Sequence, residues 1–147
     1  MNQGTVGSAD RQVTDKLVEA SFLIAGMLTR VAATNDLSLT QLRLLAILRD
    51  RRPRMAALAE HLGLDRSTVS GLVDRAVARG LVARVSDPDD GRVVLISLSP
   101  EGQELADRLN LQIGDAVATL TGRLGGAERA DLLFLLRGMI DRVETEQ

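Results

Sequence analysis

Residues 55–98 read MAALAEHLGLDRSTVSGLVDRAVARGLVARVSDPDDGRVVLISL, and this stretch decides the fold. It opens with a short predicted helix over 55–62, which the following glycine ends. Asp65 is a typical N-cap for a second helix over 66–79, and Gly80 is typical of a helix C-terminal end. Two helices joined by a short turn that contains glycine form the pattern of a helix-turn-helix.

The apolar residues change their period from about 3.6 to about 2 directly after this second helix. Residues 81–85 and 93–98 predict two short strands, and the turn-forming residues DPDDG at 87–91 lie between them. The three segments together predict a β-hairpin with a polar tip. A hairpin in this place is a wing, and helix-turn-helix proteins place the second of their paired helices in the DNA major groove.

Helical patterns continue on both sides of this unit. Upstream, apolar residues predict a helix over 12–33, and the S-x-x-Q pattern at 38–41 is a capping box for the next helix. Downstream, a long helix starts after Ser99-Pro100, and a last helix spans 127–143. The expected fold is mainly α with a β-hairpin wing, in the order α-α-α-α-β-β-α-α.

The two ends of the chain carry more apolar side chains than the chain itself can cover. Broad apolar faces fit either a monomer's own core or a dimer interface, because an obligate interface resembles a core cut in half. The little chain that remains to cover them favours a dimer. We assign residues 1–36 as an N-terminal dimerisation helix, 37–99 as the winged helix-turn-helix and 100–147 as C-terminal dimerisation helices. The candidate interface residues are Leu17, Leu109, Ile113, Leu132, Leu135, Leu136 and Met139.

Composition narrows the functional classes. The chain has 147 residues, no cysteine and one histidine, which excludes disulfides, thiol redox chemistry and cysteine-ligated metals. We find no set of nucleophile, base and orienting group and no glycine pattern for nucleotides, so we expect no enzyme, no cofactor and no metal site. The uncharged run Ala20–Thr29 is too short for a membrane span, which needs about 20 apolar residues. A cytoplasmic protein without a membrane partner is expected.

The net charge of −2 conceals a basic middle. Residues 43–92 hold ten Arg against seven Asp and Glu, while the rest of the chain holds eight Lys and Arg against thirteen Asp and Glu. A basic segment between acidic ends is compatible with a nucleic-acid-binding face. An ordinary solvated surface would also fit so small an excess.

Three pieces of residues 39–98 resemble the winged helix of the MarR (multiple antibiotic resistance regulator) family. The first is LAEHLGL at 58–64, which is similar to the family's first paired helix and turn. The second is RSTVS at 66–70, followed by LVDR and RGLV, which is similar to the recognition helix and its exit. The third is DPDDGR at 87–92, which is similar to the family's wing with its Asp-x-Arg signature. The flanking helices extend the resemblance to almost the whole chain.

The resemblance implies a triangular homodimer in which the first and the last two helices of each subunit interlock. It implies a sequence-specific transcriptional regulator that binds double-stranded DNA at a pseudo-palindromic operator. The expected regulator is a repressor, released by a small aromatic or apolar effector that binds between the two regions. Members that respond to thiol oxidation need cysteine, which this chain lacks.

The resemblance also places candidate DNA contacts on the recognition helix. Ser67, Thr68 and Ser70 lie near its start, where hydroxyls can meet phosphates or base edges, although such residues often only cap a helix. Arg66 and Arg75 are expected to contact phosphates or bases. The alternative for each arginine is a surface salt bridge.

The wing and one glycine complete the candidate DNA-binding set. Arg92 resembles the family's arginine that enters the minor groove, and Asp90 is expected to hold either Arg92 or Arg84 by a charge-assisted bond. The alternative is an Asp-Gly turn beside an exposed arginine. Arg54 is a further candidate for a phosphate contact. Gly71 departs from the family pattern, which often has a long basic side chain there, and so removes one possible base reader.

Three other interpretations stay open. His61 fits a pH switch or a metal ligand, but an exposed helix residue is simpler, since one imidazole rarely makes a site. A winged helix can also serve as a protein-interaction module, whose binding would be nearly indifferent to salt. A metal-responsive repressor is disfavoured by the lack of thiols.

Overall fold

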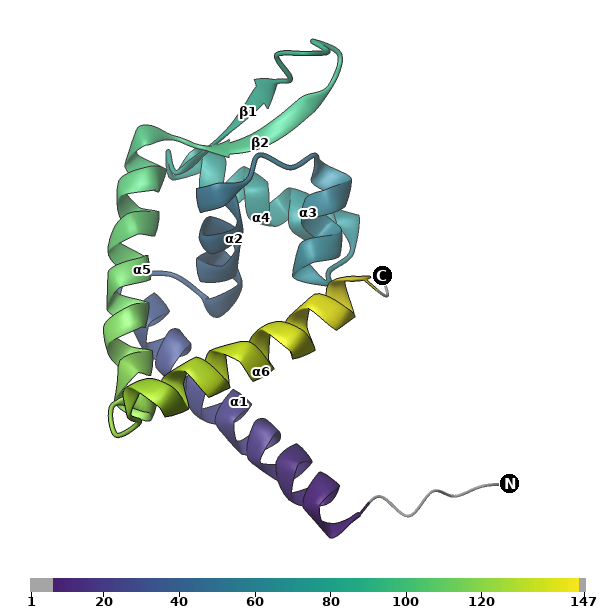
Figure 1. Cartoon of the computed structure of the whole chain (residues 1–147). Coiled ribbons are helices and arrows are strands. Elements are labelled where there is room, and N and C mark those ends of the chain that lie inside the picture. Colours follow the sequence, from purple (N-terminus) through teal and green to yellow (C-terminus); the bar gives the residue numbers. More distant parts are fainter. Residues whose placement is uncertain (1–6, 146–147) are drawn as a thin grey trace. The chain divides into compact units, whose positions relative to one another are not determined.

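The computed structural model describes residues 7–145. Its elements, in chain order, are α1 (Ser8–Thr34), α2 (Leu39–Asp50), α3 (Met55–Leu62), α4 (Arg66–Ala78), β1 (Val82–Ser86), β2 (Val94–Leu98), α5 (Pro100–Thr121) and α6 (Gly126–Thr145) (Figure 1). The predicted order of elements is confirmed. Residues 1–6 and 146–147, which belong to the two segments assigned to dimerisation, lie outside the described residues. The chain forms two compact units, the first ending at Gly114 and the second beginning at Asp115.

The helix ends of the first unit follow the caps that the sequence contains. Ser38 and Gln41 form the expected capping box: the Ser38 N–H donates to Gln41 Oε1 (2.8 Å) and the Gln41 N–H donates to Ser38 Oγ (3.1 Å). Gly63, after α3, and Gly80, after α4, have φ of 65° and 73°. Only glycine adopts this left-handed conformation without strain, so each of these residues ends its helix and turns the chain.

The core of the first unit lies among α2, α3, α4 and the hairpin. The largest side chains with less than 2% exposure come from each of these elements: Leu44, Leu45, Leu58, Val69, Val73 and Ile96. Leu105 and Leu109 of α5 extend the same cluster. Each helix therefore turns one apolar face inward, which leaves the opposite face of α4 free to contact something else.

The hairpin is fixed to the helices at its base. β1 and β2 are antiparallel, with Val82 opposite Leu98 and Ser86 opposite Val94. The Ile96 N–H donates to the Pro53 carbonyl oxygen (2.8 Å), which joins β2 to the segment before α3. These contacts leave the tip of the hairpin, but not its base, without support from the helices (Figure 1).

The start of α5 lies against the backbone that leads into β1. Ser99 Oγ donates to the Gly80 carbonyl oxygen (2.6 Å), and the Ser99 N–H donates to the Leu81 carbonyl oxygen (3.0 Å). Gly102 is buried, and a Cβ on it would lie 1.9 Å from that Leu81 oxygen. The absence of a side chain at this position therefore allows α5 to begin where it does.

We expect Gly102→Ala to destabilise the protein by about 3 kcal/mol or more, because the clash is with backbone and forces the helix away from β1. Urea unfolding followed by circular dichroism measures the change. Gly114→Ala is the matched control: it lies in the same helix, and nothing within 4 Å meets the added Cβ. The control is expected to be as stable as the parent or slightly more stable. A Gly102→Ala variant as stable as the parent would contradict the close approach.

One interface prediction is corrected by the packing of the first unit. Leu109 is 3% exposed and lies in the core cluster, and Ile113 packs against that cluster, half-buried. A partner subunit can reach little of Leu109, so it is a core residue. The apolar stripe along α5 predicted the helix but not which part of the stripe its own chain would cover.

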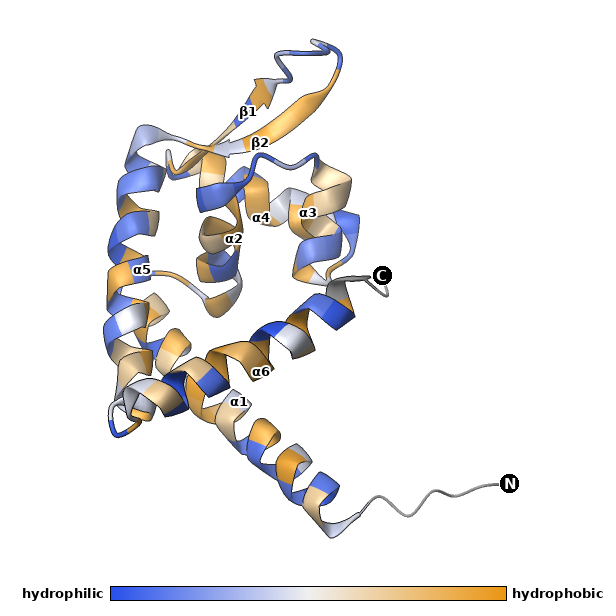
Figure 2. Cartoon of the chain, viewed as in Figure 1, coloured by the Kyte–Doolittle hydropathy of each residue, from blue (hydrophilic) through white to orange (hydrophobic). Residues whose placement is uncertain are grey.

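The two terminal helices carry many apolar residues (Figure 2), and most of these side chains are exposed. Ala32 is the one buried residue of α1, and none of the described side chains of α6 is buried. Leu135 is 59% exposed and Leu17 41%. By length and composition alone α1 is apolar enough to cross a membrane, a test that a helix covered by protein also passes.

Candidate nucleic-acid interface

The start of α4 is organised around one carboxylate. Asp65 caps the helix by accepting from the Thr68 N–H (2.9 Å), and it also accepts from Ser67 Oγ and Thr68 Oγ1 (2.6 Å each). The hydrogen bond from Ser67, followed in size by those from Thr68, holds the pKa of the Asp65 carboxyl well below its usual range. The expected cap is confirmed. Both hydroxyls take part in it, which is the alternative role that the sequence left open for them.

The arginines of α4 have no protein partner. Arg66 and Arg75 are exposed, and neither guanidinium makes an ion pair or hydrogen bond within residues 7–145. The surface salt bridge that was the alternative interpretation for both is thus not formed. Ser70 lies one turn after Arg66 and is half-buried. Two unpaired cations on the outer face of a helix are available to an anionic partner.

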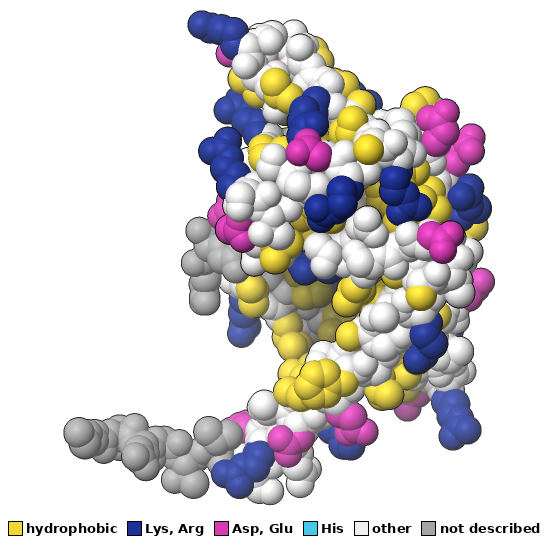
Figure 3. All heavy atoms as spheres, turned by 180° about the vertical axis from the view of Figure 1, so that it is seen from behind, with side chains coloured by type: hydrophobic (Ala, Val, Ile, Leu, Met, Phe, Trp, Pro, Cys, Tyr) yellow, Lys and Arg dark blue, Asp and Glu magenta, His cyan; other side chains and the backbone are white. Residues whose placement is uncertain are grey.

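The hairpin presents one arginine at its tip. Arg92 is 93% exposed in its side chain, and its Nε forms an ion pair with Asp90 Oδ1 at 3.3 Å. Arg84 pairs instead with Asp74 of α4 at 2.5 Å, which decides between the two partners that the sequence allowed for Asp90. The Asp74–Arg84 pair also joins α4 to β1. Basic side chains, all of them arginines, are spread over the hairpin and the helices beside it in Figure 3.

The segment before α3 presents Arg54, which the sequence had already indicated, together with two arginines that it had not, Arg51 and Arg52. Arg54 is exposed in the position that caps α3, and Arg51 and Arg52 are exposed just before it. Arg51 Nη1 lies 3.2 Å from His61 Nε2. The signal was the density of arginine in residues 49–54, where four of six positions are Arg. No group of three or more His, Cys, Asp or Glu within the described residues could hold a metal ion.

A groove lies between α2 and α5 in the first unit. One end is a cavity of about 320 Å³ lined by Arg49, Arg51, Arg52, Ser97 and Gln103, among others. The other end is smaller and apolar, lined by Leu42, Ala46, Leu109 and Ile113. Arg49 lines both ends. The groove therefore joins a cationic end to an apolar end.

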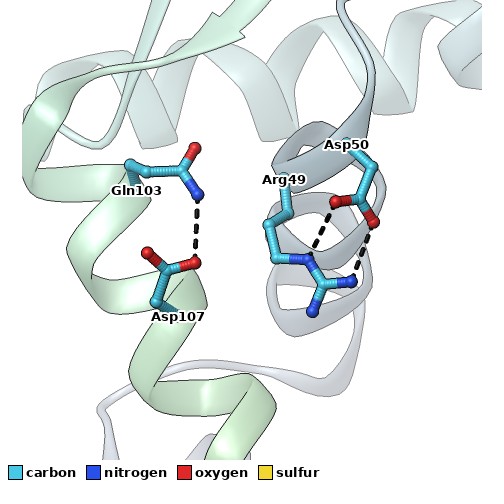
Figure 4. Close-up of polar contacts among 4 residues, drawn as sticks. All are labelled: Arg49, Asp50, Gln103 and Asp107. Carbon is cyan, nitrogen blue, oxygen red and sulfur yellow. Dashed lines mark hydrogen bonds and ion pairs between the residues drawn. The ribbon is translucent and has the colours of Figure 1, made fainter.

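Polar pairs line the two walls of this groove (Figure 4). Arg49 binds Asp50 through Nε (3.1 Å) and Nη2 (2.8 Å), and Gln103 Nε2 donates to Asp107 Oδ1 (3.1 Å). The hydrogen bond to Asp50, with smaller contributions from the charges of Asp50 and Asp107, raises the pKa of Arg49. Each pair is formed within one helix, so no hydrogen bond among these four residues crosses the groove.

Comparisons with known proteins agree on one family. A sequence model of the MarR family matches residues 35–93. The HTH-type transcriptional repressor NicR of Pseudomonas putida is 36% identical over 115 residues, which are 77% of this chain and 72% of NicR.

Solved structures share the fold. BpsR of Bordetella bronchiseptica, whose structure concerns regulation of DNA binding by 6-hydroxynicotinic acid, has a TM-score of 0.69 and 27% identity, over 96% of this chain and 99% of its own. A mutant MarR from E. coli complexed with operator DNA has a TM-score of 0.68 and 23% identity, over 87% of this chain and 93% of its own. These similarities cover the helix-turn-helix, the hairpin and the helices on either side.

Proposed function

We infer that this chain, which belongs to the MarR family of transcriptional regulators, is a repressor that binds operator DNA as a homodimer and is released by a small effector. Members of the family are regulators and not enzymes. One observation carries the proposal: α4 presents two arginines that have no partner among residues 7–145, beside a hairpin whose tip presents Arg92. Guanidinium groups in this arrangement suit phosphates and base edges.

The proposed docking places α4 in the major groove and the hairpin tip in the minor groove. Arg66 and Arg54 then contact phosphates, while Ser67, Thr68, Ser70 and Arg75 line the base edges. Arg92, positioned by Asp90, enters the minor groove, where a narrow A·T-rich groove attracts arginine. The mutant MarR from E. coli that is complexed with operator DNA has the same fold, which supports binding of an operator by this chain.

The proposed dimer forms through the exposed apolar faces of the terminal helices. Leu17, Leu132, Leu135, Leu136 and Met139 are the interface residues that we retain, joined at its edge by the half-buried Ile113. Residues 1–36 and 100–147 supply this interface, and 37–99 supply the DNA-binding region. A two-fold dimer presents two α4 helices, so its operator is a pseudo-palindrome with half-sites about one helical turn apart.

The proposed effector site is the groove between α2 and α5. Its cationic end, of about 320 Å³, fits a carboxylate or another anion together with the small ring that carries it, and its apolar end has room only for a small apolar substituent. The regulation of BpsR by 6-hydroxynicotinic acid, a small aromatic acid, supports an effector of this kind. Since α2 leads to α3 and β2 leads to α5, a ligand in the groove contacts the elements that set the position of the wing. The protein acts in the cytoplasm, with α1 covered by a partner subunit and not by lipid.

We test this function by selecting duplexes from a pool with a randomised core of roughly 25 base pairs, enough for two half-sites. The parent protein is expected to enrich one pseudo-palindromic sequence and to bind it at least about a thousandfold more tightly than a scrambled duplex. Arg92→Ala is expected to weaken binding to the enriched duplex several-fold, measured by fluorescence anisotropy. The control Arg11→Ala changes an exposed arginine of α1, far along the chain from the wing, and is expected to bind as the parent does.

Two results would contradict this proposal. An unchanged affinity of the Arg92→Ala variant for the enriched duplex at physiological salt would contradict the proposed contact between Arg92 and the minor groove. A folded parent protein that binds no duplex would favour the alternative, a winged helix that binds another protein.

A further inference from the structure

The outer face of α4 contains a row of three residues. Gly71, where the family often has a long basic side chain, is the middle one. Val69, Leu72, Val73 and Ala76 face the core, so Ser67, Gly71 and Arg75, each four residues apart, share the opposite face. Side chains on a helix point back toward its N-terminus, so a residue covers the position four before it. Arg75 is thereby directed at Gly71.

The space above Gly71 is occupied by the end of Arg75. A Cβ on Gly71 would lie 3.4 Å from Arg75 Nη1, and no other side chain or neighbouring element comes within 4 Å of it. Arg75 also lines a hollow of about 420 Å³ with Thr68 and Leu72 of α4 and with residues at the start of α2. The guanidinium therefore lies against the helix, level with position 71, instead of extending away from position 75.

Nothing in the described part of the chain competes for this guanidinium. Asp74, the adjacent carboxylate, is taken by Arg84 of β1 at 2.5 Å. Asp65, the other carboxylate near this face, accepts three hydrogen bonds from Ser67 and Thr68. Arg75 thus lies over Gly71 and keeps its donors free.

We propose that Gly71 and Arg75 form one base-reading unit, in which the missing side chain at 71 lets the Arg75 guanidinium take the position of a reader at 71. This inference rests on the proposed DNA binding and adds a specificity determinant to it. A guanidinium in the major groove donates two parallel hydrogen bonds to guanine O6 and N7. Arg75, one turn further along the helix, therefore compensates for the missing base-contacting side chain at position 71.

The test compares five variants on the duplex that the parent protein enriches from the randomised pool. Gly71→Gln places a long, uncharged side chain where the guanidinium lies, and Arg75→Ala removes the guanidinium. The double variant combines both changes. Val77→Gln is the matched control, because it adds the same side chain to an exposed position of α4 that lies off the face shared by Gly71 and Arg75.

We expect Gly71→Gln and Arg75→Ala each to weaken binding by about ten- to a hundredfold and to lose preference at the same base pair. The double variant is expected to bind no more weakly than either single variant, since both remove the same contact. Val77→Gln is expected to bind as the parent does. Gly71→Ala, whose Cβ only touches Nη1, is expected to retain the preference and to raise Tm by about 2–4 °C.

The outcomes separate this inference from the proposed function. If the parent enriches a sequence but Gly71→Gln keeps the full base preference, or if the two losses multiply in the double variant, the reading unit is overturned and DNA recognition stands. If the folded parent enriches no sequence, sequence-specific binding is overturned, and the reading role of Arg75 falls with it.

Discussion

Raising the salt concentration from 50 to 200 mM is expected to weaken operator binding by roughly a thousandfold. Arg54, Arg66 and Arg92 are three proposed phosphate or groove contacts in each subunit, which makes six in a dimer. Each such contact releases a counterion, and the logarithm of the affinity falls by about 0.9 per contact for each tenfold rise in salt. The expected slope is therefore about −5. Anisotropy titrations of the enriched duplex across a salt series measure this slope.

A charge variant calibrates this slope. Arg54→Gln removes one cation per subunit and is expected to reduce the slope by about two. Asp131→Asn is a control with a charge change of the same size on an exposed residue of α6, and it is expected to leave the slope unchanged. A parent slope near zero would contradict DNA binding and support the protein-interaction module, whose binding does not release counterions.

Leu135→Asp is expected to convert the dimer to a monomer. Leu135 is 59% exposed within one chain, so the single chain tolerates a carboxylate there. In a two-fold interface the same change places two charges in apolar surroundings, which costs several kcal/mol in total. Light scattering after size-exclusion chromatography measures the mass, and circular dichroism checks that the helices are retained.

The matched control for mass is Val94→Asp. Val94 is 50% exposed and lies on β2, outside the proposed interface, so this variant is expected to stay a dimer. The monomeric Leu135→Asp variant is expected to bind the operator at least about a hundredfold more weakly, because it engages a single half-site and loses the gain from linked binding. A folded, dimeric Leu135→Asp variant would rule out this part of α6 as the interface.

Local signals in the sequence predicted most of the fold. The capping box at Ser38 and Gln41, the cap at Asp65 and the left-handed glycines after α3 and α4 each act within a few residues, so their effect is visible in the sequence itself. The switch of apolar period placed both strands, although β1 and β2 each begin one residue later than expected. The predicted contacts with DNA and with a partner subunit stay predictions.

The features that the sequence did not reveal depend on residues far apart in the chain. The Asp74–Arg84 pair joins α4 to β1, and the sequence offered Asp90 as an equally good partner for Arg84. The burial of Leu109 depends on how α5 packs against α2, which an apolar stripe does not specify. The close approach of Gly102 to Leu81 depends on a tertiary contact across the hairpin. Periodicity predicts which face of a helix is apolar but not what covers it.

The cap at Asp65 has a consequence for the chemistry that the start of α4 can read. Ser67 and Thr68 both give their hydroxyl protons to this carboxylate, so each oxygen has only lone pairs to offer outward. A phosphate oxygen also has only lone pairs and finds no proton there. In the major groove, the amino groups of adenine and cytosine are the ones that can donate to such oxygens. Asp65, which caps the helix, thereby also determines that the two hydroxyls of the first turn accept hydrogen bonds from DNA and do not donate them.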